Sequence, residues 1–109
     1  MFGEILMHFE IVSIQKAVRN SRHRFTLHAL EKLIEKDISP EEVREAMLAG
    51  EIIETYPEDK YGPSCLELGK CKNEKILHVH CSVDPVWIIT AYCPAQKPNK
   101  WDSFFKKRR

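Results

Sequence analysis

The spacing of apolar residues changes at Gly50, and this change limits the fold more than any other feature of the chain. Before Gly50, apolar residues recur at every third or fourth position, which is typical of helices that bury one face. After Gly50 they alternate with polar residues, which is typical of half-buried strands. The sequence therefore predicts an α+β domain whose three N-terminal helices, over 10–19, 27–36 and 40–49, cover one face of an antiparallel meander over 51–93.

Capping residues mark where the second and third helices begin. Thr26 can cap the second helix, and Asp37 can take the left-handed conformation that ends it. The run Ser39-Pro40-Glu41-Glu42 predicts a capping box with proline in the first helical turn. The two helices are therefore expected to be separated by a tight connection.

The second half of the chain divides into short strands and a basic tail. The strands are expected at 51–56, 64–70, 75–83 and 86–93, with hairpin connections between the later ones. Trp101, Phe104 and Phe105 are spaced as i, i+3 and i+4, which predicts a helix within 99–109. We expect this tail to dock on the protein's own core, with a partner-binding face as the alternative.

Strand alternation assigns side chains to the two faces of the predicted sheet. Leu77, Val79 and Cys81 form an apolar set, so the side chains between them must point the other way. The same argument assigns Leu66, Leu68, Trp87, Ile89 and Ala91 to the core, and sends Ile88 outward. The uncovered face is then expected to collect Cys65, Glu67, His78, His80, Thr90 and Tyr92.

Length and composition limit the class of protein. One hydrophobic core accounts for 109 residues, so we expect a single domain over 1–109. The 17 Lys and Arg nearly cancel the 16 Asp and Glu, which argues against a uniformly basic surface. No apolar run approaches the roughly 18 residues of a membrane span, and residues 1–7 lack the features of a signal peptide. We expect a soluble, cytoplasmic protein without a membrane partner, whose four cysteines are reduced thiols.

The segment Arg24–Ser39, RFTLHALEKLIEKDIS, resembles the DUF4258 family, whose members carry a Phe/Tyr-x-x-x-His-Ala helix that runs into Glu-Arg-Gly-Ile-Ser. Lys32 stands where many relatives have Arg, and Asp37 stands where they have Gly. Lysine keeps the charge but loses the bidentate grip of arginine on phosphate. Further matching motifs extend the resemblance over about residues 24–101: they are Gly50–Pro57, Gly62–Leu66, His78–Val79, Ile89–Pro94 and Trp101.

The DUF4258 family is grouped by similarity with RelE/ParE-like and BrnT-like toxins, small α+β proteins many of which cut RNA. The resemblance therefore implies a RelE-like fold and the toxin component of a toxin–antitoxin system, acting as an endoribonuclease that needs no metal. Some members lie beside a YgiT-type zinc-finger antitoxin, so the partners that the resemblance implies are RNA and such an antitoxin. The alternative function is a non-catalytic RNA- or protein-binding module of the same fold.

A ribonuclease without a metal needs a base, an acid and cations within reach of one phosphate. His78, His80 and Tyr92 are expected on one face of the sheet, so we take them as catalytic candidates. His28 and Lys32 project from one side of the second helix and complete the set. The alternative is structural: the strand histidines cover a half-exposed sheet, and His28 ties its helix to a strand.

Charge is unevenly distributed along the chain. Residues 15–24 and 97–109 are basic, whereas residues 31–59 are acidic. We predict that the two basic segments meet RNA phosphates and that the acidic helical surface stays away from them. The alternative is that these charges are only solvated. The predicted nucleic-acid-binding residues are Arg22, Arg24, Lys60, Lys106, Lys107, Arg108 and Arg109.

Cys65 raises the question of a metal or a thiol nucleophile. Together with His78 and His80 it could supply three zinc ligands from adjacent strands, which we keep as an alternative. The spacing is unlike that of zinc ribbons or knuckles, and no helix N-terminus or neighbouring base is evident to activate the thiol. We therefore expect neither a metal nor another cofactor.

Overall fold

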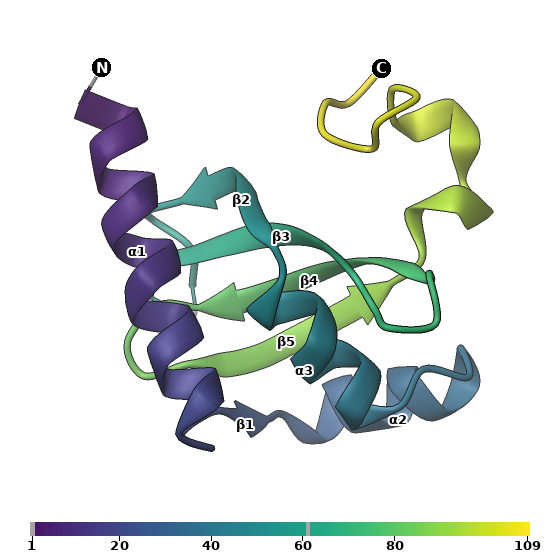
Figure 1. Ribbon diagram of the computed structural model, residues 1–109, viewed down its shortest axis with the longest axis horizontal. Helices are drawn as coiled ribbons and strands as arrows, with labels where there is room; N and C mark the ends of the chain where they lie inside the picture. The colour runs from purple at the N-terminus through teal and green to yellow at the C-terminus, as the bar shows by residue number, and fades with distance from the viewer. Residues whose placement is uncertain (1, 61) are drawn as a thin grey trace.

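The computed structural model describes residues 2–60 and 62–109 and has the predicted α+β architecture (Figure 1). The helices lie in the N-terminal half and the sheet in the C-terminal half. The helices are α1 (Phe2–Arg19), α2 (Leu27–Glu35) and α3 (Pro40–Leu48). The predicted start of the first helix at residue 10 is wrong, because α1 already begins at Phe2. The strands are β1 (Arg24–Phe25), β2 (Glu51–Tyr56), β3 (Ser64–Lys70), β4 (Ile76–Ser82) and β5 (Trp87–Tyr92). Two 3₁₀ turns follow, η1 (Pro94–Gln96) and η2 (Pro98–Lys100).

The sheet has the strand order β1-β5-β4-β3-β2. Strands β2 to β5 form an antiparallel meander, as the alternation after Gly50 predicts. The two residues of β1 pair with β5 in parallel, with Arg24 opposite Trp87 and Phe25 opposite Ile88. The complete sheet is therefore mixed, because the short link between the first two helices joins its edge.

The predicted capping signals act as expected. Oγ1 of Thr26 accepts a hydrogen bond of 3.0 Å from the backbone N–H of Ala29 and starts α2. Asp37 follows α2 with a φ of 55°, in the left-handed region. Ser39 and Glu42 form the reciprocal capping box of α3, with hydrogen bonds of 3.0 and 2.8 Å. These local bonds place α2 and α3 one after the other across the sheet.

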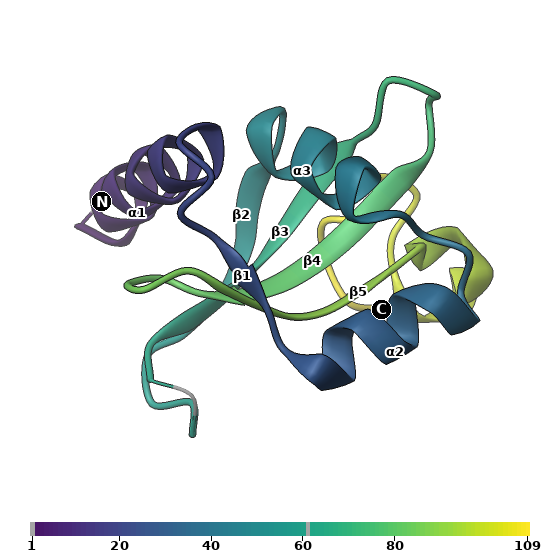
Figure 2. The ribbon, with the colours of Figure 1, turned by 90° about the horizontal axis from the view of Figure 1, so that it is seen from below.

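A single apolar core lies between the helices and one face of the sheet. Figure 2 shows α1 and α3 together on that side. Residue 69 must be glycine where α3 crosses β3, because an added Cβ would lie only 1.9 Å from the carbonyl oxygen of Ala46. No helix of the described chain has the length and apolarity that crossing a membrane would need. Residues of the core include Ile14, Val18, Ala29, Leu33, Val43, Met47, Leu77, Val79, Cys81, Ile88 and Ala91.

The predicted facing of β3 is wrong. Cys65 pairs directly with Cys81, and cross-strand neighbours share a face, so Cys65 lies in the helix-covered core. Glu67 lies on the same side and is only 1 % exposed. Leu66 and Leu68 instead occupy the opposite face. The error follows from assuming that the more apolar side chains of a strand mark the helix-covered face, whereas here the opposite face is also partly covered.

The predicted facing of β5 is wrong in its first half. The pairing of β4 with β5 shifts between His80, which is opposite Thr90, and Cys81, which is opposite Ile88. The extra residue reverses the alternation, so Ile88 enters the core and Trp87 is 39 % exposed. Beyond the shift the prediction is confirmed: Ala91 lies in the core, and Thr90 pairs on the face that carries His80.

The C-terminal tail is not the predicted helix. After the two 3₁₀ turns, Trp101 is extended and bridges to Arg108. Oδ1 of Asp102 accepts from the backbone N–H groups of Phe104 and Lys106, at 3.1 and 3.0 Å, and so holds a turn in place of a helix. Trp101 is 2 % exposed whereas Phe104 is 74 % exposed. The tail therefore docks on its own domain through Trp101.

Candidate functional site

A cleft of about 760 Å³ opens on the sheet face opposite the helices. One wall comes from the end of β2 and the connection to β3, another from the C-terminal tail, and the floor from β3, β4 and β5. We refer to it as the His80 cleft. Its lining residues are Thr55, Tyr56, Pro57, Glu58, Asp59, Leu66, His80, Thr90, Tyr92 and Arg108.

His80 is held by two groups from the β2–β3 region. Its Nε2 lies 3.2 Å from Oδ2 of Asp59 and 2.9 Å from Oγ of Ser64. Oγ of Ser64 also donates to Oδ2 of Asp59 at 2.6 Å. An ionised carboxylate can only accept hydrogen bonds, so Nε2 carries a proton and donates it. In the neutral imidazole the basic nitrogen is therefore Nδ1.

The protonation states of this group follow from its surroundings. Burial lowers the pKa of His80 below its usual 6.5, although the charge and hydrogen bond of Asp59 oppose the shift. The hydrogen bond from Ser64 lowers the pKa of Asp59, and the nearby His80 acts in the same direction. At neutral pH the cleft thus presents a neutral imidazole beside an ionised carboxylate, and the carboxylate can stabilise the imidazolium that forms when Nδ1 takes a proton.

His78 lies on the same face as His80, as predicted, but it is completely buried beneath the tail. Its Nε2 is 2.7 Å from the carbonyl oxygen of Phe105, which can only accept, so Nε2 donates. Its Nδ1 is 3.1 Å from the hydroxyl of Tyr92, which then donates to it. The ring of Trp101 packs edge to face against the imidazole, and burial lowers the pKa of His78. Both ring nitrogens are occupied, so His78 serves as a structural link between sheet and tail.

Tyr56 of β2 and Arg108 of the tail both line the cleft and share Glu54 as a partner. The hydroxyl of Tyr56 donates to Glu54, and burial together with this bond raises the pKa of Tyr56 to about 12. Its ring meets the imidazole of His80 edge-on, with centroids 5.4 Å apart. Arg108 binds both carboxylate oxygens of Glu54, at 2.9 and 3.0 Å. The guanidinium is therefore fixed in place at the rim of the cleft.

A second, smaller hollow of about 250 Å³ adjoins the His80 cleft. Tyr92 and Arg108 line both hollows. Lys36, at the end of α2, lies over the ring of Tyr92 with its Nζ 5.6 Å from the ring centroid. We call this hollow the lysine pocket. Its lining residues are Lys36, Tyr92, Cys93, Gln96, Lys97, Lys100, Trp101 and Arg108.

The helical candidates do not reach either hollow. His28 is exposed on α2, and Lys32 pairs with Glu35 on the same helix at 3.2 Å. Neither side chain lines the His80 cleft or the lysine pocket. The structure therefore brings together His78, His80 and Tyr92 from the predicted catalytic set, and leaves His28 and Lys32 outside.

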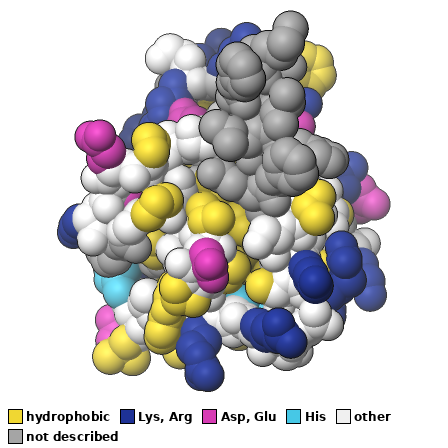
Figure 3. Space-filling view, turned by 90° about the vertical axis from the view of Figure 1, so that its left-hand side faces the viewer, with side chains coloured by type: hydrophobic (Ala, Val, Ile, Leu, Met, Phe, Trp, Pro, Cys, Tyr) yellow, Lys and Arg dark blue, Asp and Glu magenta, His cyan; other side chains and the backbone are white. Residues whose placement is uncertain are grey.

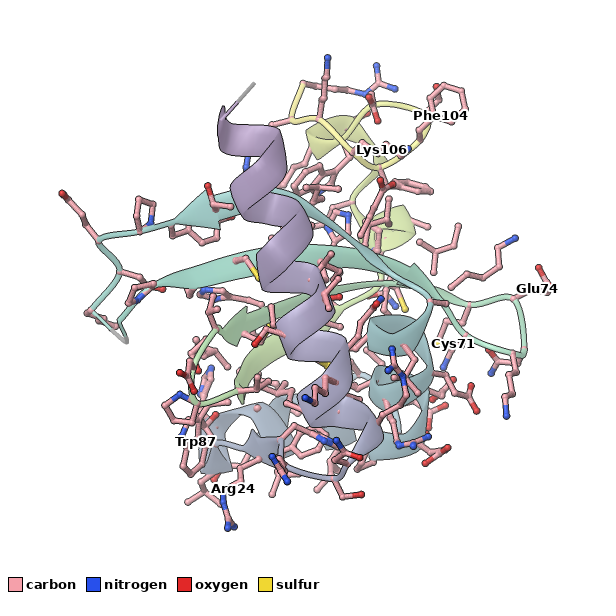
Figure 4. The ribbon with its side chains drawn as sticks, turned by 60° about the vertical axis from the view of Figure 1, so that its left-hand side comes forward. Arg24, Cys71, Glu74, Trp87, Phe104 and Lys106 are labelled. Carbon is pink, nitrogen blue, oxygen red and sulfur yellow. The ribbon has the colours of Figure 1, made fainter. Side chains whose placement is uncertain are left out.

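The two predicted basic segments lie apart. Figure 4 shows Arg24 and Lys106 at opposite ends of the molecule. Lys and Arg side chains gather low on the face seen in Figure 3, and Lys16 and Arg22 line a small pocket at the C-terminal end of α1. The structure thus does not join residues 15–24 and 97–109 into one surface.

The cations of the tail differ in their surroundings. Lys106 pairs with Glu51 at 2.9 Å, and the guanidinium of Arg109 donates to the carbonyl oxygen of Trp101. Lys60 and Lys107 are exposed and line neither hollow. Arg108 is thus the one predicted nucleic-acid-binding residue that lines these two hollows.

Sequence reasoning missed Asp59, Ser64 and Tyr56 around the imidazole, and Lys36 beside Tyr92. Ser64 lies 16 residues from His80 and Asp59 lies 21 residues away, and they meet only because β3 pairs with β4 in one register. The signal that could have found them is a polar residue within the 57–63 turn, Asp59, followed by a polar residue at the start of the next strand, Ser64.

The proposed zinc ligands do not meet. Cys65 lies on the helix-covered face, whereas His78 and His80 lie on the other. Within residues 2–60 and 62–109, no three His, Cys, Asp or Glu side chains are grouped to hold a metal ion. The Sγ of Cys65 is instead 3.9 Å from that of Cys81, inside the apolar core.

Residues 25–93 match the family model described as "Domain of unknown function (DUF4258)". The chain belongs to the DUF4258 family. The match runs from β1 to the end of the sheet, so the DUF4258 region supplies His78, His80, Asp59 and Tyr92. Helix α1 and the tail, which contributes Arg108 to the cleft, lie outside it. Comparisons with curated proteins and with solved structures gave no match.

Proposed function

We propose that this DUF4258 protein binds single-stranded RNA in the His80 cleft and cleaves it without a metal, as the toxin of a toxin–antitoxin system. The observation that carries the proposal is the setting of His80. It is an imidazole in an accessible cleft, and burial keeps it neutral. Ionised Asp59 accepts the hydrogen bond from its Nε2, which leaves Nδ1 as the basic nitrogen. Two tyrosine rings and Arg108 line the same cleft and suit the bases and phosphates of a nucleotide chain.

In the proposed reaction, Nδ1 of His80 takes the proton of a ribose 2′-hydroxyl. The 2′-oxygen attacks phosphorus, the bond from phosphorus to the 5′-oxygen breaks, and a water molecule protonates that leaving oxygen. The hydroxide that remains takes the proton back from the His80 imidazolium. The products are a 2′,3′-cyclic phosphate and a 5′-hydroxyl end. Asp59 stabilises the imidazolium through Nε2, and a positioned base of this kind contributes about 10²–10⁴-fold to the rate.

The RelE-like fold, the toxin role and the antitoxin are parts of the same proposal, and the resemblance of the sequence motifs supports them. A YgiT-type zinc-finger protein is the kind of antitoxin that this resemblance implies. Such a partner would neutralise the protein most directly by covering the His80 cleft. Co-expression with the product of a neighbouring gene, followed by co-purification, tests this part.

One observation favours a second candidate function, a non-catalytic RNA-binding module. His78 is locked by two hydrogen bonds, so the cleft offers one free imidazole rather than two. Tyr92 already donates its hydroxyl proton to His78, and the pKa of Tyr56 is about 12. Neither tyrosine is therefore placed to act as a strong general acid.

The experiment that separates the two functions compares wild type with His80→Ala and with His28→Ala, an exposed histidine outside the cleft. Purified proteins are incubated with all-ribose and all-deoxyribose forms of mixed-sequence oligonucleotides. We expect cleavage of the ribose form alone, retained by His28→Ala and lost by His80→Ala, with 2′,3′-cyclic phosphate ends. RNA binding by wild type without any cleavage would instead establish the binding module.

The same variants can be expressed in growing cells. We expect induced wild type and His28→Ala to arrest growth and His80→Ala to be harmless. Absence of both RNA binding and growth arrest for the wild type would reject both functions. His78→Ala is not an informative active-site variant, because removing a fully buried imidazole disturbs the fold itself.

A further inference from the structure

The lysine pocket gathers four cations around two aromatic rings. Lys36 lies over the ring of Tyr92, and the guanidinium of Arg108 lies 4.7 Å from the ring centroid of Trp101. Lys97 directly precedes η2 and Lys100 is its last residue, and both line the hollow. The short turn η2 therefore brings both lysines to one hollow.

The charges of the three lysines are not balanced within the described lining of the pocket. Among the residues that the structure describes, no Asp or Glu lines the hollow. Among the described residues, Lys36, Lys97 and Lys100 form no ion pair, whereas Arg108, the fourth cation of the pocket, is paired with Glu54. Like charges held close together repel, and an anion between them relieves that repulsion.

The surroundings of Lys36 strengthen this point. Its side chain is half-buried, and burial together with the charges of Lys32 and Lys97 lowers its pKa. A lysine in such a position is stabilised when a negative group binds beside it.

We propose that the lysine pocket is a phosphate-binding site. The ligand class is a phosphate group carried by a nucleotide or an oligonucleotide, and the shared wall of Tyr92 and Arg108 places it next to whatever occupies the His80 cleft. As a subsite for RNA this inference rests on the proposed function, whereas binding of phosphate alone does not. Lysine suits phosphate binding because its ammonium group is a compact charge that can donate hydrogen bonds to phosphate oxygens from several directions.

The first experiment titrates the full chain with inorganic pyrophosphate at low salt and measures binding by NMR of the backbone amides. We expect pyrophosphate to shift the amide resonances of residues 92–101. Lys97→Gln/Lys100→Gln should weaken this binding at least about tenfold. The control is Lys16→Gln/Arg19→Gln, which removes two exposed charges at the end of α1 and should bind as wild type does. Both pairs are exposed, so the folds can be compared by thermal melting.

A second arm distinguishes the source of the phosphate, using tetraribonucleotides with a 5′-phosphate or a 5′-hydroxyl. A preference for the phosphorylated form that disappears in Lys97→Gln/Lys100→Gln assigns a terminal phosphate to the pocket. Equal binding of both forms, weakened equally by the variant, assigns an internal phosphodiester. Unchanged pyrophosphate affinity in the variant, or no shifts at 92–101, would overturn the proposal. Pyrophosphate binding without RNA cleavage would keep it and reject only the nuclease.

Discussion

Trp101 lies against the imidazole of His78, with the ring centroids 4.3 Å apart and the rings nearly perpendicular at 78°. Through this contact the C-terminal tail closes part of the sheet face that the helices leave free. The uncharged state of His78 and the shape of the adjoining cleft both depend on it. The tail is thus part of the candidate site even though it lies outside the family match.

Trp101→Ala should raise the pKa of His78 toward its usual 6.5. Burial is the main cause of the present lowering, and removal of the indole admits water to the ring. An NMR titration of the histidine ring protons measures the change. Phe104→Ala is the matched control, because that side chain is 74 % exposed and its loss should leave the titration unchanged. An unchanged pKa in Trp101→Ala would show that the tail does not shield His78.

Glu67 should make the protein less stable as the pH rises. Burial raises its pKa to about 8 from the usual 4.5, so the folded chain keeps a proton that the unfolded chain releases. The stability that this proton contributes to the folded chain is fully present below about pH 4.5 and is lost as the pH rises to about 8. Over that range the free energy of unfolding falls by about 1.4 kcal/mol per pH unit.

Urea unfolding of wild type and Glu67→Gln between pH 5 and pH 8 measures this contribution as a difference. We expect the stability difference to move in favour of Glu67→Gln as the pH rises, because glutamine cannot ionise. Glu31→Gln, on the exposed surface of α2, should follow the wild type throughout. Parallel curves for wild type and Glu67→Gln would mean that Glu67 ionises normally in the folded chain.

Gly69→Ala should destabilise the fold by about 3 kcal/mol. The added Cβ would overlap the carbonyl oxygen of Ala46, and this atom belongs to helix backbone, which cannot rotate away. Gly62→Ala is the comparison, because its φ is +81° but nothing lies within 4 Å of the added atom. There we expect only the backbone penalty of about 1–2 kcal/mol. Equal losses in the two variants would contradict a close contact between α3 and β3.

The salt dependence of RNA binding should assign the cations that contact phosphates. For a single strand, log K falls with log salt by about 0.7 per phosphate contact. Lys97→Gln/Lys100→Gln should flatten the slope, whereas Arg22→Gln/Arg24→Gln should not, since Figure 4 places Arg24 at the far end of the molecule. Equal flattening by both pairs would restore the two-ended RNA surface that the charge pattern predicts.

Most limits of helices and strands could be predicted because their signals are local, although α1 begins at Phe2 and not at residue 10 as predicted. Thr26 and Ser39 cap helices through bonds to residues three positions away, and the alternation after Gly50 is visible within each strand. The β5 bulge could not be predicted, since it exists only in the pairing of Cys81 with Ile88. The facing of β3 failed for a related reason: the tail and the β2–β3 connection make the second face apolar enough to accept Leu66.

The candidate site was predictable in part. Strand alternation correctly placed His78, His80 and Tyr92 on one face. Alternation carries no information about which histidine a distant segment will bury. The tail buries His78 and leaves His80 in the cleft, and this difference is visible only in the folded chain. The partners of His80 likewise come from a connection whose path is set by pairing between strands.

Tyr92 forms part of the wall of both hollows, and this position governs how their ligands influence each other. If a ligand in the lysine pocket displaced the ring, its effect on affinity in the His80 cleft would be returned by the same factor, because thermodynamic coupling is reciprocal. The hydrogen bond to His78 holds the ring from behind. Because the ring is held in place, a ligand in one hollow should change the affinity of the other hollow very little, and separate ligands should bind independently. A long ligand that spans both hollows should bind more tightly, because its second half is already tethered close to its site.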